Sequence, residues 1–279
     1  MTVLLSVLAR LVGWVAVMCL VAGVAFVGPR RLYELAHDIG PRVREARREI
    51  AGVIVVIVVS ALGRGPLETV SELVGMRLTA TIYGFEGEFV AWLQATFVRP
   101  ELTMYFSWVY VYGYVFLLVF PFIAYAALPD RTTLRRLLAA YGLNYGIGLL
   151  FYTLILAHGP RNVMPDVVTS LLYTFNPDFQ ALTTEVNTNT NVFPSLHTSL
   201  SATVAIFAVL TGREYPGWAV VAVPLAVSVI IATMYLGIHW LVDVLGGIGL
   251  AAGTVYLSYR LVDPADRDAT DDDAVPAGD

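Results

Sequence analysis

Two short segments of the sequence carry side chains suited to nucleophilic and acid–base chemistry. The first reads N-V-F-P-S-L-H-T-S at 191–199, and the second reads T-M-Y-L-G-I-H-W-L-V-D at 233–243. The chain has four histidines, and each segment holds one of them, His197 and His239. Each segment lies where an apolar run meets a polar loop, so we expect both at the same face of a membrane.

The second segment contains a histidine and a carboxylate at helical spacing. His239 and Asp243 are four residues apart, which places two side chains on one face of a helix. A carboxylate in this position accepts the imidazole N–H, fixes the tautomer and holds the ring. The other ring nitrogen is then free to attack an electrophile. A purely structural His–Asp pair at a helix end has the same pattern, so this pair alone leaves both interpretations open.

The first segment has the pattern of a helix start. Pro194 is expected at the first helical position, where proline is favoured. The free N–H groups of such a start bind anions, Ser195 adds a hydroxyl donor, and His197 falls in the first turn. Taken alone, the segment is better explained as an ordinary helix start with polar residues.

The composition indicates an integral membrane protein. The chain has 279 residues, of which 57% are hydrophobic and 14% are charged, whereas a soluble domain carries about a quarter charged residues. Its mean hydropathy is +0.70. The single cysteine, Cys19, excludes a disulfide within the chain and a cysteine-based metal site. Nucleic-acid binding is not expected, because no basic patch has aromatic residues interleaved with it.

The apolar runs predict an all-α integral membrane helical bundle of about six to seven transmembrane helices. The run at 51–63 is short, so it is either a short span or a helix packed inside the bundle. A signal peptide explains the first run less well, because that run is long and contains a charge. The seven expected spans are 3–28, 51–63, 104–128, 137–156, 196–211, 217–237 and 240–260.

The charges fit one topology. All seventeen basic residues are arginine, and many lie in the connections at 29–49 and 129–136, which the positive-inside rule places in the cytoplasm. The connection at 158–193 and both histidine segments then lie outside. We therefore expect a multi-pass cell-membrane protein whose functional residues lie on the extracytoplasmic face.

Three regions are expected along the chain. Residues 1–100 form an N-terminal membrane helix or helices plus an amphipathic segment, in which Glu86 either reaches a substrate head group or belongs to a solvated face. Residues 101–262 form the membrane core. Residues 263–279 are acidic and lack aromatics, which predicts a disordered tail.

Together the two histidine segments are much more specific than either one. Pro-Ser-x-His, followed after roughly forty residues by His-x-x-x-Asp in a polytopic chain, resembles the type 2 phosphatidic acid phosphatase superfamily over about residues 100–260. Thr233 stands where many members carry arginine. In this respect the chain looks most like the inositol phosphorylceramide synthase-like branch.

The resemblance implies a fold with a phosphatase-like membrane core and a role for each matching residue. His239 matches the nucleophile that forms a phosphohistidine, and Asp243 matches the carboxylate that orients it. His197 matches the general acid that protonates the leaving oxygen. Ser195 and the backbone N–H groups at Leu196 would hold the phosphoryl oxygens.

This sequence departs from the family pattern in its cations. The first family motif is a lysine, six residues, then Arg-Pro, but this chain has no lysine, and its only Arg-Pro, at Arg99, comes early. Arg161, about thirty residues before Pro194, is the best candidate for binding phosphate. The depleted set of cations favours the synthase-like branch, or a different head group, over a plain phosphatidate phosphatase. No cofactor or metal is expected, since members of the superfamily need none.

Several functions remain open. Water attacking the phosphohistidine would make the protein a lipid phosphatase or a polyprenyl (di)phosphate phosphatase, whereas a polyol such as inositol would make it a phosphotransferase. The acceptor pocket is expected from 158–193 and 64–102. The alternative class is a non-catalytic lipid-binding or transport protein, which the absence of internal repeats disfavours. The sequence does not indicate an oligomeric state.

Overall fold

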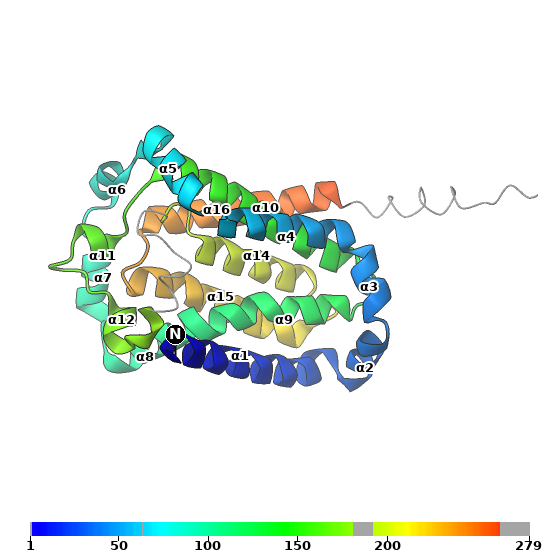
Figure 1. Ribbon diagram of the computed structural model, residues 1–279. Coiled ribbons are helices and arrows are strands. Elements are labelled where there is room, and N and C mark those ends of the chain that lie inside the picture. The colour runs from blue at the N-terminus through cyan, green and yellow to red at the C-terminus, as the bar shows by residue number, and fades with distance from the viewer. Residues whose placement is uncertain (1, 63, 181–191, 263–279) are drawn as a thin grey trace, which may run out of the picture.

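The chain folds into a bundle of helices that run side by side between two ends (Figure 1). The structure is a computed structural model, and it describes residues 2–62, 64–180 and 192–262. The N-terminal part comprises α1 (Thr2–Ala22), the π-helical η1 (Gly23–Val27), α2 (Pro29–His37), α3 (Ile39–Glu45), α4 (Arg47–Leu62), α5 (Arg64–Val74), β1 (Met76–Arg77), α6 (Thr79–Glu86) and α7 (Phe89–Phe97). The expected tail at 263–279 lies outside the described residues.

The second part of the chain supplies most of the bundle. It comprises α8 (Pro100–Trp108), the π-helical η2 (Val109–Gly113), α9 (Tyr114–Ala126), α10 (Thr132–Leu154), β2 (Ile155–Leu156), α11 (Pro160–Val163), α12 (Leu171–Phe175), α14 (Leu196–Leu210), α15 (Pro216–Tyr235) and α16 (Leu241–Leu261). The strands β1 and β2 form a short parallel pair in which Met76 lies opposite Ile155.

The described residues contain five helices that are long and apolar enough to cross a membrane. They are Leu4–Val27, Pro100–Ala126, Thr132–Leu154, Pro216–Tyr235 and Leu241–Leu261. A sixth span exists if α4 and α5, which are bent by 78° at their junction, count as one. The expected all-α membrane bundle is therefore confirmed. Seven separate spans were expected, whereas five or six are found among the described residues, because α4 bends into α5 and α14 is too short to qualify.

The short helix α14 is the centre of the bundle. Its 15 residues fall below the roughly 20 that a spanning helix needs. It packs against α15, α16, α10 and α9, and Leu200, Val204 and Phe207 have no exposed surface. Because protein surrounds α14, its length does not have to match the thickness of the lipid.

A buried polar cluster joins three helices at this centre. Asn144 of α10 donates to Thr203 of α14 at 3.1 Å and to Thr254 of α16 at 3.0 Å, and it accepts from Ser199 of α14 at 2.6 Å. Polar side chains between membrane helices fix how the helices pack, because apolar contacts alone resemble contacts with lipid. The cluster therefore sets the relative position of the helices that carry His197 and Asp243.

The N-terminal helices pack against the outside of this core. The helix α1 contacts α9, and Arg10, which lies within the first apolar run, pairs with Asp178 at 3.1 Å. The helix α4 packs along α10 without a fully buried residue. It is thus a peripheral helix, and the alternative of a helix enclosed by the bundle is wrong.

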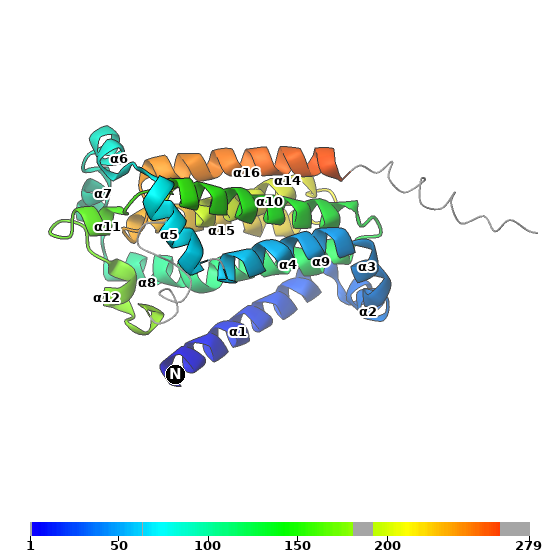
Figure 2. The ribbon, with the colours of Figure 1, turned by 45° about the horizontal axis from the view of Figure 1, so that its top comes forward.

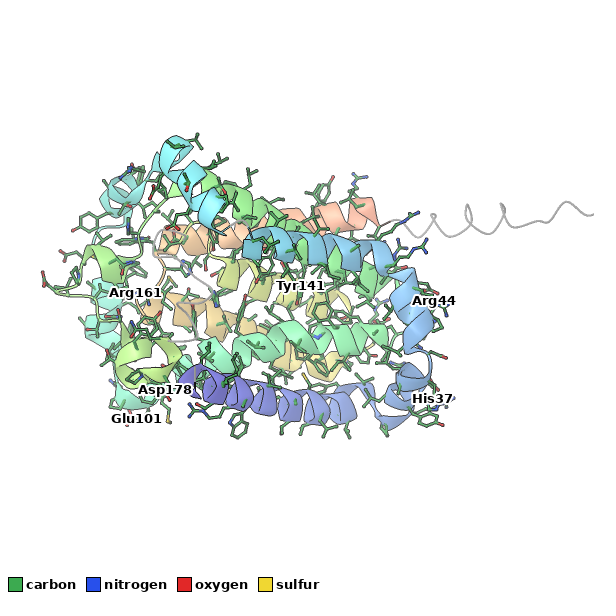
Figure 3. All side chains as sticks on the ribbon, in the orientation of Figure 1. His37, Arg44, Glu101, Tyr141, Arg161 and Asp178 are labelled. Carbon is green, nitrogen blue, oxygen red and sulfur yellow. The ribbon has the colours of Figure 1, made fainter. Side chains whose placement is uncertain are left out.

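The connecting segments gather at two opposite ends of the bundle. Figures 1 and 2 show α6, α7, α11 and α12 at one end, with α2 and α3 at the other. In Figure 3, Arg161 and Asp178 lie at the first end, and Arg44 and His37 lie at the second. Alternation of the chain between these ends brings the starts of α14 and α16 to the end that carries Arg161.

Candidate active site

The centre of the candidate site is the pair formed by His239 and Asp243. Nδ1 of His239 lies 3.3 Å from Oδ2 of Asp243, and both side chains are buried. In the tautomer in which Nδ1 donates to this carboxylate, Nε2 keeps its lone pair. The second carboxylate oxygen, Oδ1, is buried without a hydrogen-bond partner in the described part of the chain.

The sequence predicts this pair correctly but for the wrong local reason. His239 does not lie on the helix, because α16 begins at Leu241 and Trp240 is its N-cap. Asp243 lies in the first turn, and its Oδ2 also accepts the backbone N–H of Trp240 at 2.8 Å. A carboxylate in the first turn that reaches back to the N-cap N–H is half of a capping box. The same carboxylate therefore starts the helix and holds the imidazole.

The backbone before α16 is a tight turn that fixes the position of His239. The carbonyl of Thr233 accepts the N–H groups of Ile238 and His239, at 3.0 and 3.1 Å. Gly237 has a φ of +74°, a conformation that residues with a Cβ rarely adopt. Thr233, which stands where the family that the sequence resembles often carries arginine, thus supports the histidine through its main chain.

The start of α14 lies against the start of α16. The N–H of Ser195 donates to the carbonyl of Asp243 at 3.0 Å, so the two helix starts are joined directly. Gly247 makes this approach possible, because a Cβ there would lie 2.6 Å from the carbonyl oxygen of Ser195. The two histidine segments, some forty residues apart in sequence, therefore form one unit.

The expected helix start at Pro194 is wrong by two residues. The helix α14 begins at Leu196, with Ser195 as an extended N-cap whose Oγ accepts the N–H of Thr198 at 3.3 Å. Serine at the N-cap satisfies an N–H that would otherwise lack a partner, and this sets the boundary. Ser195 is fully buried, and its O–H can still donate while Oγ accepts the N–H of Thr198.

His197 lies in the first turn of α14 against two tyrosines. Its ring stacks on Tyr110 with centroids 4.5 Å apart and packs on Tyr114 at 4.2 Å. It is close enough to His239 for the two imidazoles to interact electrostatically. Both tyrosines come from the spanning segment that contains η2, and π-helical turns are frequent at functional sites. Neither tyrosine was predicted as a site residue, although alternating tyrosines at 110, 112 and 114 in an apolar run were a visible signal.

Two hydrogen bonds to main-chain carbonyls hold the segment around Arg161 at the same end of the bundle. The backbone N–H of Arg161 donates to the carbonyl of Gly237 at 3.1 Å, and Nε1 of Trp240 donates to the carbonyl of His158 at 2.8 Å. Its guanidinium lies 4.9 Å from the centroid of Tyr173, and Nη2 donates to the Tyr173 hydroxyl at 3.4 Å. Nη1 is buried without a hydrogen-bond partner among the described residues, so a donor remains available for a ligand.

Tyrosine side chains lie beside both Arg161 and His197. Tyr110, which stacks on His197, interacts electrostatically with both Arg161 and Tyr173. From the other side, Tyr152 of α10 lies beside the backbone N–H of Leu196 and within electrostatic range of Asp243. Arg161, His197, His239 and Asp243 therefore lie at the same end of the bundle, and these four residues are called the cluster below.

Glu86 connects the N-terminal region to the candidate site. Its two carboxylate oxygens accept the N–H groups of Leu241 and Val242, at 2.8 and 3.1 Å, and so cap the start of α16. Partial burial raises the pKa of the Glu86 carboxyl above its ordinary value, the two hydrogen bonds oppose this, and the charge of Asp243 adds to it. Glu86 is half-buried and bound to the start of the helix that carries Asp243, so it is not simply part of a solvated face.

Other residues singled out in the sequence lie apart from the cluster. Arg99 is exposed, and its backbone N–H donates to the Tyr235 hydroxyl at 3.3 Å. His158 is exposed and contacts Thr79 through its backbone N–H. No group of three or more His, Cys, Asp or Glu residues in the described ranges is placed to hold a metal ion.

The fold and the cluster define an all-helical membrane protein with two histidines at one end of the bundle. The sequence model of the PAP2 superfamily matches residues 83–257. The chain therefore belongs to the PAP2 superfamily, whose members are phosphatases, and membership indicates a phosphatase or a phosphotransferase. No curated protein and no solved structure matched the chain.

Proposed function

We propose that the protein is a membrane enzyme that cleaves or transfers the phosphoryl group, or phospho-head-group, of a lipid through a phosphohistidine at His239. The observation that supports this most strongly is the buried His239–Asp243 pair, in which Nδ1 faces the carboxylate and Nε2 is the ring nitrogen left for the substrate. Nε2 forms the bond to phosphorus while the bond from phosphorus to the ester oxygen breaks. His197 donates a proton to that departing oxygen as general acid.

The phosphoryl oxygens are bound by Arg161 and by donors at the start of α14. The free Nη1 of Arg161 supplies a charged donor, and the O–H of Ser195 and the N–H groups near Leu196 supply neutral ones. Preorganised donors in a site that excludes water stabilise the charge of a transferring phosphoryl group. In the second step, a hydroxyl oxygen attacks phosphorus, the bond to Nε2 breaks, and the hydroxyl proton passes to His197.

The acceptor decides which enzyme this is. Water as the acceptor gives a lipid phosphatase or a polyprenyl (di)phosphate phosphatase. A polyol hydroxyl gives a phosphotransferase of the inositol phosphorylceramide synthase-like branch, and the small number of cations supports this version. The expected acceptor pocket draws on 158–193, of which 181–191 lie outside the described residues. A non-catalytic lipid-binding protein is the alternative from a different class.

We place the site on the extracytoplasmic side of the membrane. The arginine-rich helices α2 and α3 lie at the end opposite Arg161 (Figures 1 and 3), and Arg131, after α9, pairs with Glu45 of α3 at that end. Arginine in short connections favours the cytoplasmic side. An antibody to a tag placed after residue 279 should react only after permeabilisation of spheroplasts.

The test of the proposed reaction is phosphate release by the purified protein. A panel of lipid phosphates and phospholipids is incubated with and without inositol, and both free phosphate and lipid products are measured. His239→Ala should lose activity while His37→Ala, at the opposite end of the bundle, retains it. Free phosphate identifies a phosphatase, and a phosphorylated polyol or glycolipid without free phosphate identifies a transferase. Equal signals from native protein and His239→Ala would contradict the proposed enzymatic activity and favour a non-catalytic lipid-binding protein.

A further inference from the structure

An apolar groove runs along the outside of the bundle between α10 and α16. Its volume is about 370 Å³, within the range of about 300–1,000 Å³ found for ligand pockets. The two helices run side by side in both views of the ribbon (Figures 1 and 2). The groove is lined by Ile147 and Phe151 of α10, Phe193 and Pro194 before α14, and Gly246, Gly249, Leu250, Gly253, Thr254 and Leu257 of α16.

One end of this groove adjoins the candidate active site. Pro194 precedes Ser195, the N-cap of α14, and the Phe193 ring would lie 2.7 Å from a Cβ at position 246. Gly246 therefore admits the aromatic ring that lines this end of the groove. From Gly246 to Leu257 the groove follows α16 for about 16 Å, away from the catalytic groups and toward the other end of the bundle.

The open width of the groove comes from two glycines on one face of α16. A Cβ at Gly249 or at Gly253 would have no heavy atom of the described residues within 4 Å. These two positions are four residues apart, so they lie one above the other along the helix. By contrast, Gly246 and Gly247 are needed for close packing, since a Cβ there would meet Phe193 and Ser195 at 2.7 and 2.6 Å.

The lining is suited to hydrocarbon and to little else. Its polar side chain, Thr254, already donates to the carbonyl of Leu250 at 2.9 Å and accepts from Asn144 at 3.0 Å. Both walls belong to helices that are long and apolar enough to span a membrane, so the groove lies at the depth of lipid chains. An occupant with hydrogen-bonding groups would lose its water there without replacement.

We propose that the groove between α10 and α16 binds an acyl or prenyl chain of the lipid whose phosphate is held at His239, and that Gly249 and Gly253 set how well long chains fit. This inference rests on the proposed function for the position of the phosphate. The chain lies along α16 from Phe193 toward Leu257. The groove thereby discriminates substrates by chain length, separately from the chemistry at the histidines.

Two substitutions fill the groove without disturbing the site. Gly249→Leu and Gly253→Leu place side chains in open space, and leucine favours a helix more than glycine does. Gly13→Leu is the matched control, because a Cβ at Gly13 on α1 also meets nothing within 4 Å among the described residues. Thermal unfolding in detergent should be alike for all three variants and the native protein.

The kinetic experiment compares dipalmitoyl phosphatidate with dibutyryl phosphatidate. Each groove variant should lower kcat/KM for the palmitoyl substrate by about 10-fold or more, because several methylene contacts are lost. The butyryl substrate should change by less than about 2-fold, since its chains barely enter the groove. Equal losses for both substrates, or no loss for either, would overturn the proposal.

A second readout does not depend on turnover. His239→Ala protein is photolabelled with a phosphatidate that carries a diazirine near the end of a palmitoyl chain, and the labelled peptides are mapped. Label should appear in α10 and α16 and should fall when Gly249→Leu or Gly253→Leu is added, but not with Gly13→Leu. The matching diacylglycerol has the same chains but no phosphate. If it labels α10 and α16 equally well, the groove holds only annular lipid and the proposal is overturned. If labelling depends on the phosphate but the native protein releases no phosphate, the proposed binding of the chain in the groove stands and the proposed reaction is contradicted.

Discussion

Asp243 accepts a hydrogen bond from the ring of His239 through Oδ2, the same oxygen that accepts the Trp240 N–H at the start of α16. One carboxylate thus orients the imidazole and caps a helix. Because the helix start and the ring share this oxygen, the orientation of His239 depends on the position of α16. A mobile surface carboxylate would not give this restriction.

Asp243→Asn should therefore separate the two tasks of this residue. Its amide can still cap the N–H of Trp240, but it no longer holds Nδ1–H with a charge. We expect kcat to fall by about 10²–10⁴-fold, with a small change in thermal stability. Phosphate release and unfolding temperature measured on the same preparations check this, and an unchanged kcat would remove Asp243 from the mechanism.

His197→Ala should make activity depend on the leaving group. Without the general acid, the departing oxygen must leave unprotonated, which is hard for an alkyl alkoxide and easy for an aryl oxide. We expect a loss of about 10²–10⁴-fold on an alkyl phosphate and a much smaller loss on a nitrophenyl phosphate of the same chain. Parallel losses on both substrates would assign His197 a packing role against Tyr110 and Tyr114 instead.

Arg161→Gln should weaken the binding of phosphate more than it affects the fold. Its Nη1 has no hydrogen-bond partner in the described residues, so a ligand oxygen gains a charge-assisted bond there. Such bonds contribute about 1.5–3 kcal/mol, which corresponds to a KM roughly 10-fold or more higher. Arg44→Gln, at the opposite end of the bundle in Figure 3, is the control and should leave KM unchanged.

The stability of the protein should depend on the ionisation of Glu86. Because the folded protein raises the pKa of this carboxyl, the folded state holds the proton more tightly than the unfolded state does. The resulting contribution to stability is present below the ordinary carboxyl pKa and is lost as pH rises through the raised value. The difference in unfolding temperature between the native protein and Glu86→Gln should therefore change in one direction with pH. The native protein should lose stability relative to the variant as the pH is raised from below the ordinary carboxyl pKa to neutrality. A relative rise would contradict the direction of the shift.

Asn144→Leu should destabilise the bundle without removing any group from the site. The substitution leaves Ser199, Thr203 and Thr254 without three buried hydrogen bonds. Interhelical hydrogen bonds in membranes contribute about 0.6 kcal/mol each on average, so the total loss should be about 1–3 kcal/mol. Asn162→Leu, at an exposed position, is the matched control for thermal unfolding in detergent.

The sequence by itself determined the membrane class, the helical bundle and the pairing of its two histidine segments. Long apolar runs suffice for the first two, because the bilayer requires spans of about 20 apolar residues whatever their packing. The motifs were local enough to read, since His239 and Asp243 are only four residues apart. The roles of these residues remain predictions that the experiments above test.

Only the tertiary structure decided how the pieces meet. The capping of α16 by Glu86, the tyrosines against His197 and the docking of Arg161 on Gly237 join residues between 76 and 156 positions apart along the chain. Such contacts depend on which helices neighbour each other and on where glycines allow close approach, as Gly247 does at Ser195. The periodicity of apolar residues predicts neither the neighbours of a helix nor its points of close approach, because a helix face is apolar whether it meets lipid or another helix.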